Sequence, residues 1–128
     1  MDYQSISRRA KLAQKSISIA STDQKNSVLL KILEEIEASR ELILSSNQRD
    51  MNESRRLDLG DALLDRLELN NARIDGMIDC LSEIIALADP VGEVSRMTRR
   101  PSGIEVGLMR QPIGVIGIIF ESRPNVTL

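Results

Sequence analysis

The sequence predicts an α/β chain in which helices come first and strands follow. Residues 1–92 repeat apolar side chains at helical spacing, whereas six of the seven glycines and all four prolines lie at or beyond Gly76. Residues 113–119 then form an almost continuous apolar run rich in β-branched side chains. We therefore expect a helical arm over residues 1–92, a β-hairpin over residues 93–111, and the first strand of a parallel sheet within residues 112–128.

The first two helices are predicted from apolar side chains three or four positions apart. The first helix carries Ile6, Ala10, Ala13 and Ile17, and residues 21–23 interrupt it. Ser21 and Gln24 have the spacing of a capping box, in which side chain and backbone satisfy the free donors at a helix start. A second helix should begin there and end near residues 45–47, followed by a polar stretch over residues 47–56.

Two more helices complete the predicted arm, a short one around residues 61–67 and a longer one that Asn70 can cap. The longer helix has the clearest apolar stripe in the sequence, formed by Ile74, Met77, Ile78, Leu81, Ile85 and Ala88. Pro90 prevents it from continuing. Cys80 lies at the margin of this stripe, and the chain has no histidine to activate a thiol. We interpret Cys80 as a small buried hydrophobe rather than a catalytic thiolate.

A hairpin is predicted next, with strands over residues 93–98 and 104–110 and a turn at residues 101–103. The second strand alternates as a half-buried strand does. Four arginines surround the hairpin, and we interpret them as protection of a sheet edge rather than as a phosphate site; they are Arg96, Arg99, Arg100 and Arg110. Gly114 and Gly117 do not complete a Gly-x-Gly-x-x-Gly turn, so we interpret them as glycines that let another backbone approach a buried strand.

The polar residues 121–125 follow directly after the predicted buried strand. The carboxyl ends of strands in open α/β sheets face the ligand crevice, and this strand needs neighbours and a crossover helix that we expect beyond residue 128. The Asn125 amide could donate to an oxygen on which negative charge develops. Asparagine is equally suited to cap a following helix, so the residues alone leave both roles open.

Composition excludes several classes of function. The 17 basic and 19 acidic residues give a net charge of -2, and aromatics make up 2% of the chain, so we expect no nucleic-acid partner. No signal sequence and no apolar run of about 20 residues is visible, so we expect a cytoplasmic protein with no membrane span. A single cysteine forms no internal disulfide, and the absence of histidine and of clustered cysteines argues against a metal site.

Three segments resemble bacterial γ-glutamyl phosphate reductases, a family also called glutamate-5-semialdehyde dehydrogenases. They are residues 87–92 (Leu-Ala-Asp-Pro-Val-Gly), residues 100–107 (Arg-Pro-Ser-Gly-Ile-Glu-Val-Gly) and residues 111–127. The most specific part is Glu-Ser-Arg-Pro-Asn-Val-Thr at residues 121–127. Weaker resemblance extends through the helices.

This resemblance implies the N-terminal part of an aldehyde dehydrogenase-like fold. Residues 112–128 would begin a Rossmann-like cofactor domain, and the hairpin would assist assembly of a homo-oligomer. The implied reaction is the NADPH-dependent reduction of L-glutamyl 5-phosphate to L-glutamate 5-semialdehyde with release of phosphate, a step of proline biosynthesis.

The resemblance also assigns residues. Asn125 matches the side-chain donor of the oxyanion hole, and Phe120, Glu121 and Ser122 are expected at the wall of the nicotinamide pocket. The family's catalytic cysteine belongs to a later segment, so we expect residues 1–128 alone to be inactive. Two alternatives stay open: a non-catalytic helical and hairpin module or remnant, and another aldehyde or acyl-phosphate dehydrogenase.

Overall fold

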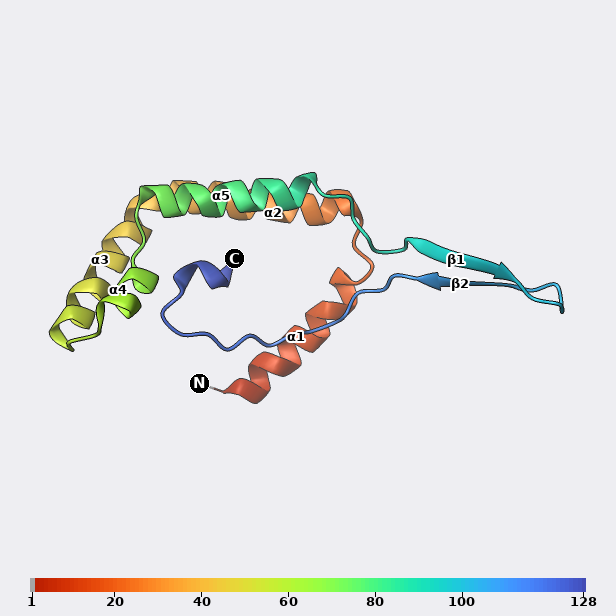
Figure 1. The fold of residues 1–128 in the computed structure, drawn as a ribbon, viewed down its shortest axis with the longest axis horizontal. Helices are drawn as coiled ribbons and strands as arrows, with labels where there is room; N and C mark the ends of the chain where they lie inside the picture. The colour runs from red at the N-terminus through yellow and green to blue at the C-terminus, as the bar shows by residue number, and fades with distance from the viewer. Residues whose placement is uncertain (1) are drawn as a thin grey trace. The chain divides into compact units, whose positions relative to one another are not determined.

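The structure, a computed structural model, describes residues 2–128. Its described chain divides into two compact units, one made of residues 2–22 and 88–117 and the other of residues 23–87 and 118–128. Residues 2–128 form five α-helices, followed along the chain by a two-stranded hairpin and a short 3-10 helix, η1. Figure 1 shows these elements in chain order. Across residues 2–128, no helix is both long enough and apolar enough to cross a membrane.

The first unit begins with helix α1, Tyr3–Ile17. Asp2 caps it, because its side-chain Oδ1 accepts from the backbone N–H groups of Gln4 at 3.1 Å and Ser5 at 3.2 Å. The predicted first helix is confirmed, and it ends before residues 21–23 as its sequence pattern indicated.

The predicted hairpin is also confirmed, with β1 (Val94–Arg99) antiparallel to β2 (Glu105–Met109). Gly103 has a φ of 88° in the turn, a conformation that suits glycine. The predicted half-burial of the second strand is wrong, since every residue of both strands is exposed. A two-stranded ribbon without a covering layer leaves both of its faces open.

The hairpin contains a bulge. Ser95 pairs with Leu108 and Thr98 pairs with Val106, so Arg96 and Met97 together oppose the single residue Gly107. Two residues against one is the pattern that bends a strand and strengthens its twist.

The strand predicted over residues 113–119 is absent, because residues 110–120 form neither helix nor strand. Ile113 is 94% exposed and Ile119 is 103% exposed, so the run is not buried on either side. A strand exists only where a neighbouring backbone pairs with it, and no described segment does so here. The interpretation of Gly114 and Gly117 as sites of close backbone approach is also wrong, since no atom would lie within 4 Å of a Cβ at either position.

The second unit contains α2 (Thr22–Ala38), α3 (Arg40–Arg56), α4 (Asp61–Leu67), α5 (Asn71–Ala86) and η1 (Pro124–Thr127). The predicted end of a helix near residues 45–47 is wrong. The chain breaks at Ser39 instead, and α3 continues through the polar stretch to Arg56. Two side chains within that stretch, Asn47 and Met51, are buried, which explains why a stretch of polar composition stays helical.

Helices α4 and α5 match the prediction closely. Asn70 caps α5 as expected, with its Oδ1 accepting from Arg73 N at 3.0 Å. Ile74 and Leu81 of the predicted stripe are buried, at 0% and 3% exposure, and with Met51 they are the buried apolar residues of the described chain. So small a core means that polar contacts must fix the joints between helices.

Candidate functional site

The short helix η1 carries Asn125, the predicted catalytic residue. Arg123 is its N-cap, and Val126 N donates to the Arg123 carbonyl at 3.0 Å. Ser122, just before this turn, has a φ of 49°, which reverses the chain direction in a conformation uncommon for serine. Asn125 lies inside η1 rather than at its start, so it does not cap this short helix.

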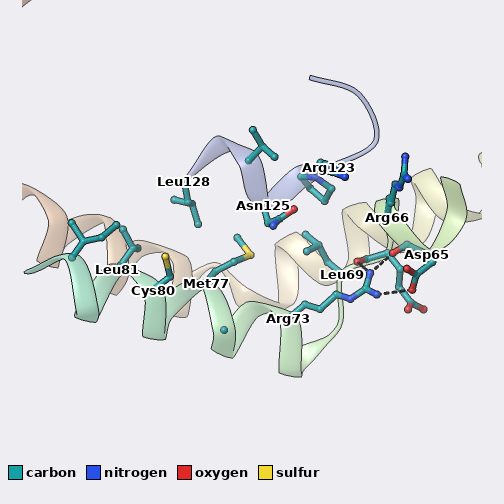
Figure 2. A pocket seen from close by; sticks show the side chains of 15 residues that line it. Asp65, Arg66, Leu69, Arg73, Met77, Cys80, Leu81, Arg123, Asn125 and Leu128 are labelled. Atoms are coloured by element: carbon teal, nitrogen blue, oxygen red, sulfur yellow. Dashed lines mark hydrogen bonds and ion pairs between the residues drawn. The ribbon is translucent and has the colours of Figure 1, made fainter. Parts of the chain in front are cut away.

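Asn125 lines a cavity of about 500 Å³ within the second unit. Helix α5 forms one wall and η1 forms another, and the end of α4 closes one side (Figure 2). Figure 2 shows Asn125 opposite Met77 of α5, with Cys80 and Leu81 further along the same helix. The cavity therefore joins an amide donor from η1 to an apolar helix face.

The charged residues of the cavity gather where α4 leads into α5. Arg73 is held there, with Nη2 2.7 Å from Asp65 Oδ1 and Nη1 2.7 Å from the Glu68 carbonyl oxygen. Its Nη1 also donates to the Asp65 carbonyl. Arg66 and Arg123 line the same cavity, and neither guanidinium has an ion pair or hydrogen bond with any of residues 2–128. This arrangement favours an anionic ligand group over a cationic one.

Cys80 lines the cavity and is exposed, so the interpretation of Cys80 as a buried hydrophobe is wrong. Cys80 lies at the margin of the α5 stripe and lines the cavity together with Met77 and Leu81 of the same helix. In the described part of the chain, no group of three or more histidine, cysteine, aspartate or glutamate side chains could hold a metal ion.

The three predicted cofactor residues lie elsewhere in this segment. Phe120, Glu121 and Ser122 precede η1 and do not line the cavity. Phe120 is 47% exposed, so it remains partly accessible to a ligand. The structure thus brings Asn125 into the cavity, whereas the other three residues lie outside its lining.

Sequence reasoning missed the arginines of this site. Arg66 and Arg73 carry no motif, and only the folding of α4 against the start of α5 brings them to the cavity. Arg123 did have a signal, because it stands two residues before Asn125 in the most specific segment of the sequence.

Comparison with curated proteins gives relatives of one enzyme, although no protein-family model matches the chain. The chain is 50% identical over 125 residues to gamma-glutamyl phosphate reductase from Psychrobacter arcticus, covering 98% of this chain and 29% of that protein. It is 41% identical over 127 residues to the enzyme of the same name from Desulforamulus reducens, covering 99% of this chain and 31% of that protein.

Solved structures give the same result. Gamma-glutamyl phosphate reductase from Thermotoga maritima superposes with a TM-score of 0.88 at 42% identity, covering 94% of this chain and 29% of that one. The enzyme of the same name from Saccharomyces cerevisiae superposes with a TM-score of 0.93 at 29% identity, covering 99% of this chain and 32% of that one. The chain is therefore similar, over nearly its whole length, to the N-terminal part of gamma-glutamyl phosphate reductase, and it spans about three tenths of the relatives it matches.

Proposed function

We propose that these residues act as the N-terminal part of a γ-glutamyl phosphate reductase. That enzyme would reduce L-glutamyl 5-phosphate to L-glutamate 5-semialdehyde with release of phosphate, using NADPH, in proline biosynthesis in the cytoplasm. The observation that carries the proposal is 50% identity to such a reductase across 98% of the chain. The TM-scores of 0.88 and 0.93 support it independently of any single motif.

In this proposal Asn125 stabilises the transition state. Its side-chain amide donates a hydrogen bond to the acyl oxygen as that oxygen gains negative charge, and a donor fixed in advance costs no reorganisation when the reaction occurs. The 3-10 turn supports this role, because Pro124 restricts the backbone and Val126 N bonds back to Arg123. NADPH supplies the hydride when it is bound.

The residues before η1 fit one end of that cofactor. Phe120 presents an open ring and Glu121 is exposed, so both can line a nicotinamide pocket. The cofactor phosphates need other residues, because the segment around Gly114 and Gly117 has no dinucleotide-binding fingerprint. Cys80 has no part in the proposed chemistry.

A homo-oligomer is part of the proposal. Both faces of the hairpin are exposed, and its apolar side chains need cover; these include Val94, Met97, Val106 and Leu108. Light scattering on the active enzyme should give a mass above that of one chain, and a monomer would contradict this part.

A chimera tests the activity directly. The matching N-terminal segment of the Psychrobacter arcticus reductase would be replaced by residues 1–128, and NADPH formation would be followed from L-glutamate 5-semialdehyde, NADP and phosphate. We expect activity comparable with the parent enzyme, and none from the parent lacking its N-terminal segment. A panel of other aldehydes checks the substrate. A chimera that folds and assembles like the parent yet has no reductase activity would overturn the proposal.

A further inference from the structure

A constrained backbone carries Arg123 into the cavity that Asn125 also lines. Both residues line the same cavity, and a single proline separates them. The left-handed Ser122 and the bond from Val126 N to the Arg123 carbonyl, 3.0 Å long, fix the backbone on both sides of Arg123. A long side chain leaving a fixed backbone loses less freedom when it binds a ligand.

The charges of the cavity leave Arg123 available. Five charged residues line it, and they are Asp65, Arg66, Glu68, Arg73 and Arg123. The Arg73 guanidinium donates hydrogen bonds to the Asp65 carboxylate and to two backbone carbonyls. Across residues 2–128, Arg66 and Arg123 make no such contacts, so two uncommitted guanidinium groups face a cavity whose other acid is Glu68.

We propose that Arg123 binds the phosphoryl group of the acyl-phosphate substrate and thereby selects an acyl phosphate over a free acid. This inference rests on the proposed reductase function. The phosphoryl group is joined through a bridging oxygen to the acyl carbon, and Asn125 would donate a hydrogen bond to the other oxygen on that carbon. The residue that binds the phosphoryl group must therefore lie close to Asn125. A guanidinium fork matches two phosphoryl oxygens at once, with shorter and stronger hydrogen bonds than a neutral donor makes.

The same contact serves the departure of phosphate. A nucleophile supplied by the later segment of the enzyme, the family's cysteine thiolate, bonds to the acyl carbon. As the bond from that carbon to the bridging oxygen breaks, its electron pair leaves with the phosphate, which gains negative charge. The Arg123 guanidinium partly neutralises that charge. Arg66 lines the same cavity from α4, farther along the chain from Asn125, and is assigned the lesser role.

The test uses the active chimera with three variants: Arg123→Gln, Arg123→Lys and the control Arg55→Gln, which removes an exposed arginine of α3 outside the cavity. The KM values for inorganic phosphate and for NADP are measured in the direction of semialdehyde oxidation. Arg123→Gln should raise the KM for phosphate about tenfold or more, as loss of hydrogen bonds to a charged group does. Arg123→Lys should fall between that variant and the unchanged chain, and Arg55→Gln should leave both constants unchanged.

Each outcome either supports or overturns the proposed contact between Arg123 and the phosphoryl group. An unchanged phosphate KM in Arg123→Gln overturns the inference, and so does a rise confined to the KM for NADP, which would make Arg123 a cofactor contact. If Arg123→Gln does not fold, the phosphate KM of Arg123→Lys decides, with an unchanged value overturning the inference. An inactive unsubstituted chimera counts against the proposed function, whereas an active chimera with insensitive Arg123 variants counts against the phosphoryl contact alone.

Discussion

Arg40 Nη2 lies 2.7 Å from Asp75 Oδ1, which ties the first residue of α3 to α5. The same nitrogen lies 2.5 Å from Glu37 Oε2 on α2, and Nη1 lies 3.4 Å from Asn71 Oδ1. A hydrogen bond to Glu37, and to a smaller extent one to Asp75, raises the pKa of the Arg40 guanidinium above its ordinary value. The side chain therefore stays charged. One side chain therefore fixes the break between α2 and α3 against a third helix.

Arg40→Ala should lower the melting temperature more than Asp75→Ala does, because it releases partners on two other helices at once. Arg40→Lys keeps the charge but loses the planar fork, so its melting temperature should lie between those of Arg40→Ala and the unchanged protein. Thermal unfolding followed by circular dichroism measures all three.

The control for Arg40 is Arg56→Ala. Arg56 pairs with Glu53 at 2.9 Å, but the two side chains are 78% and 56% exposed, so the pair should contribute little. Equal melting temperatures for Arg40→Ala and Arg56→Ala would contradict the role of Arg40 in holding the break between α2 and α3 against α5.

Asn47→Ala should destabilise the second unit by about 2 kcal/mol, since it leaves a half-buried backbone acceptor and a half-buried backbone donor unpaired. Asn47 is 5% exposed, its Nδ2 donates to the Leu67 carbonyl at 2.8 Å, and its Oδ1 accepts from Leu69 N at 2.7 Å. Asn47→Asp keeps only the second bond and should also destabilise. Urea unfolding gives the free energies. Asn52→Ala, on the exposed side of α3, serves as the control, and the two alanine variants unfolding at the same urea concentration would refute this role.

Arg96→Gly should stabilise the hairpin by about 1 kcal/mol, because it removes a side chain from a left-handed residue. Arg96 has a φ of 54° in the bulge. Gly107→Ala should act in the opposite direction, since its Cβ would lie 3.0 Å from Val94 Cγ1 and closer still to the Met97 sulfur. Hydrogen exchange of the β1 and β2 amides should slow in the first variant and quicken in the second. Faster exchange in Arg96→Gly would argue against strain at the bulge.

Ile119→Lys should reduce self-association of the 128-residue chain. Residues 113–119 expose an apolar, β-prone run without backbone partners, which is the kind of segment that joins chains together. Sedimentation velocity over a range of concentrations measures the effect. Ile19→Lys, which replaces an 85% exposed isoleucine outside the run, is the matched control. A chain that stays monomeric at high concentration would contradict the prediction.

Local signals predicted much of the fold. The Asn70 cap, the Pro90 stop and the turn glycine Gly103 each act within a few residues, so the sequence pattern alone located α5 and the hairpin. The continuation of α3 through residues 47–56 depends on Asn47 meeting the backbone of Leu67 and Leu69. Such a contact across about twenty residues leaves no periodic trace in the sequence.

The residues of the candidate site were likewise predicted only in part from the sequence. Asn125 was predicted as a site residue because it lies in a specific motif after an apolar run, and the structure places it on the cavity. The arginines from α4 and α5 reach the cavity through helix packing, which no pattern of spacing predicts. Residues 113–119 and Cys80 were expected to be buried, and that prediction was wrong. Hydrophobicity predicts only a preference for burial, whereas actual burial depends on which segments pack against these residues.

The turnover number of Asn125→Ala in the chimeric reductase tests the central claim most directly. Removing one oxyanion donor usually costs about 100-fold or more in kcat. We expect a loss of that size with the KM for NADP nearly unchanged, while Asn52→Ala keeps the activity of the unsubstituted chimera. Unchanged turnover in a correctly folded Asn125→Ala variant would contradict the assignment of Asn125 as the residue that stabilises the oxyanion.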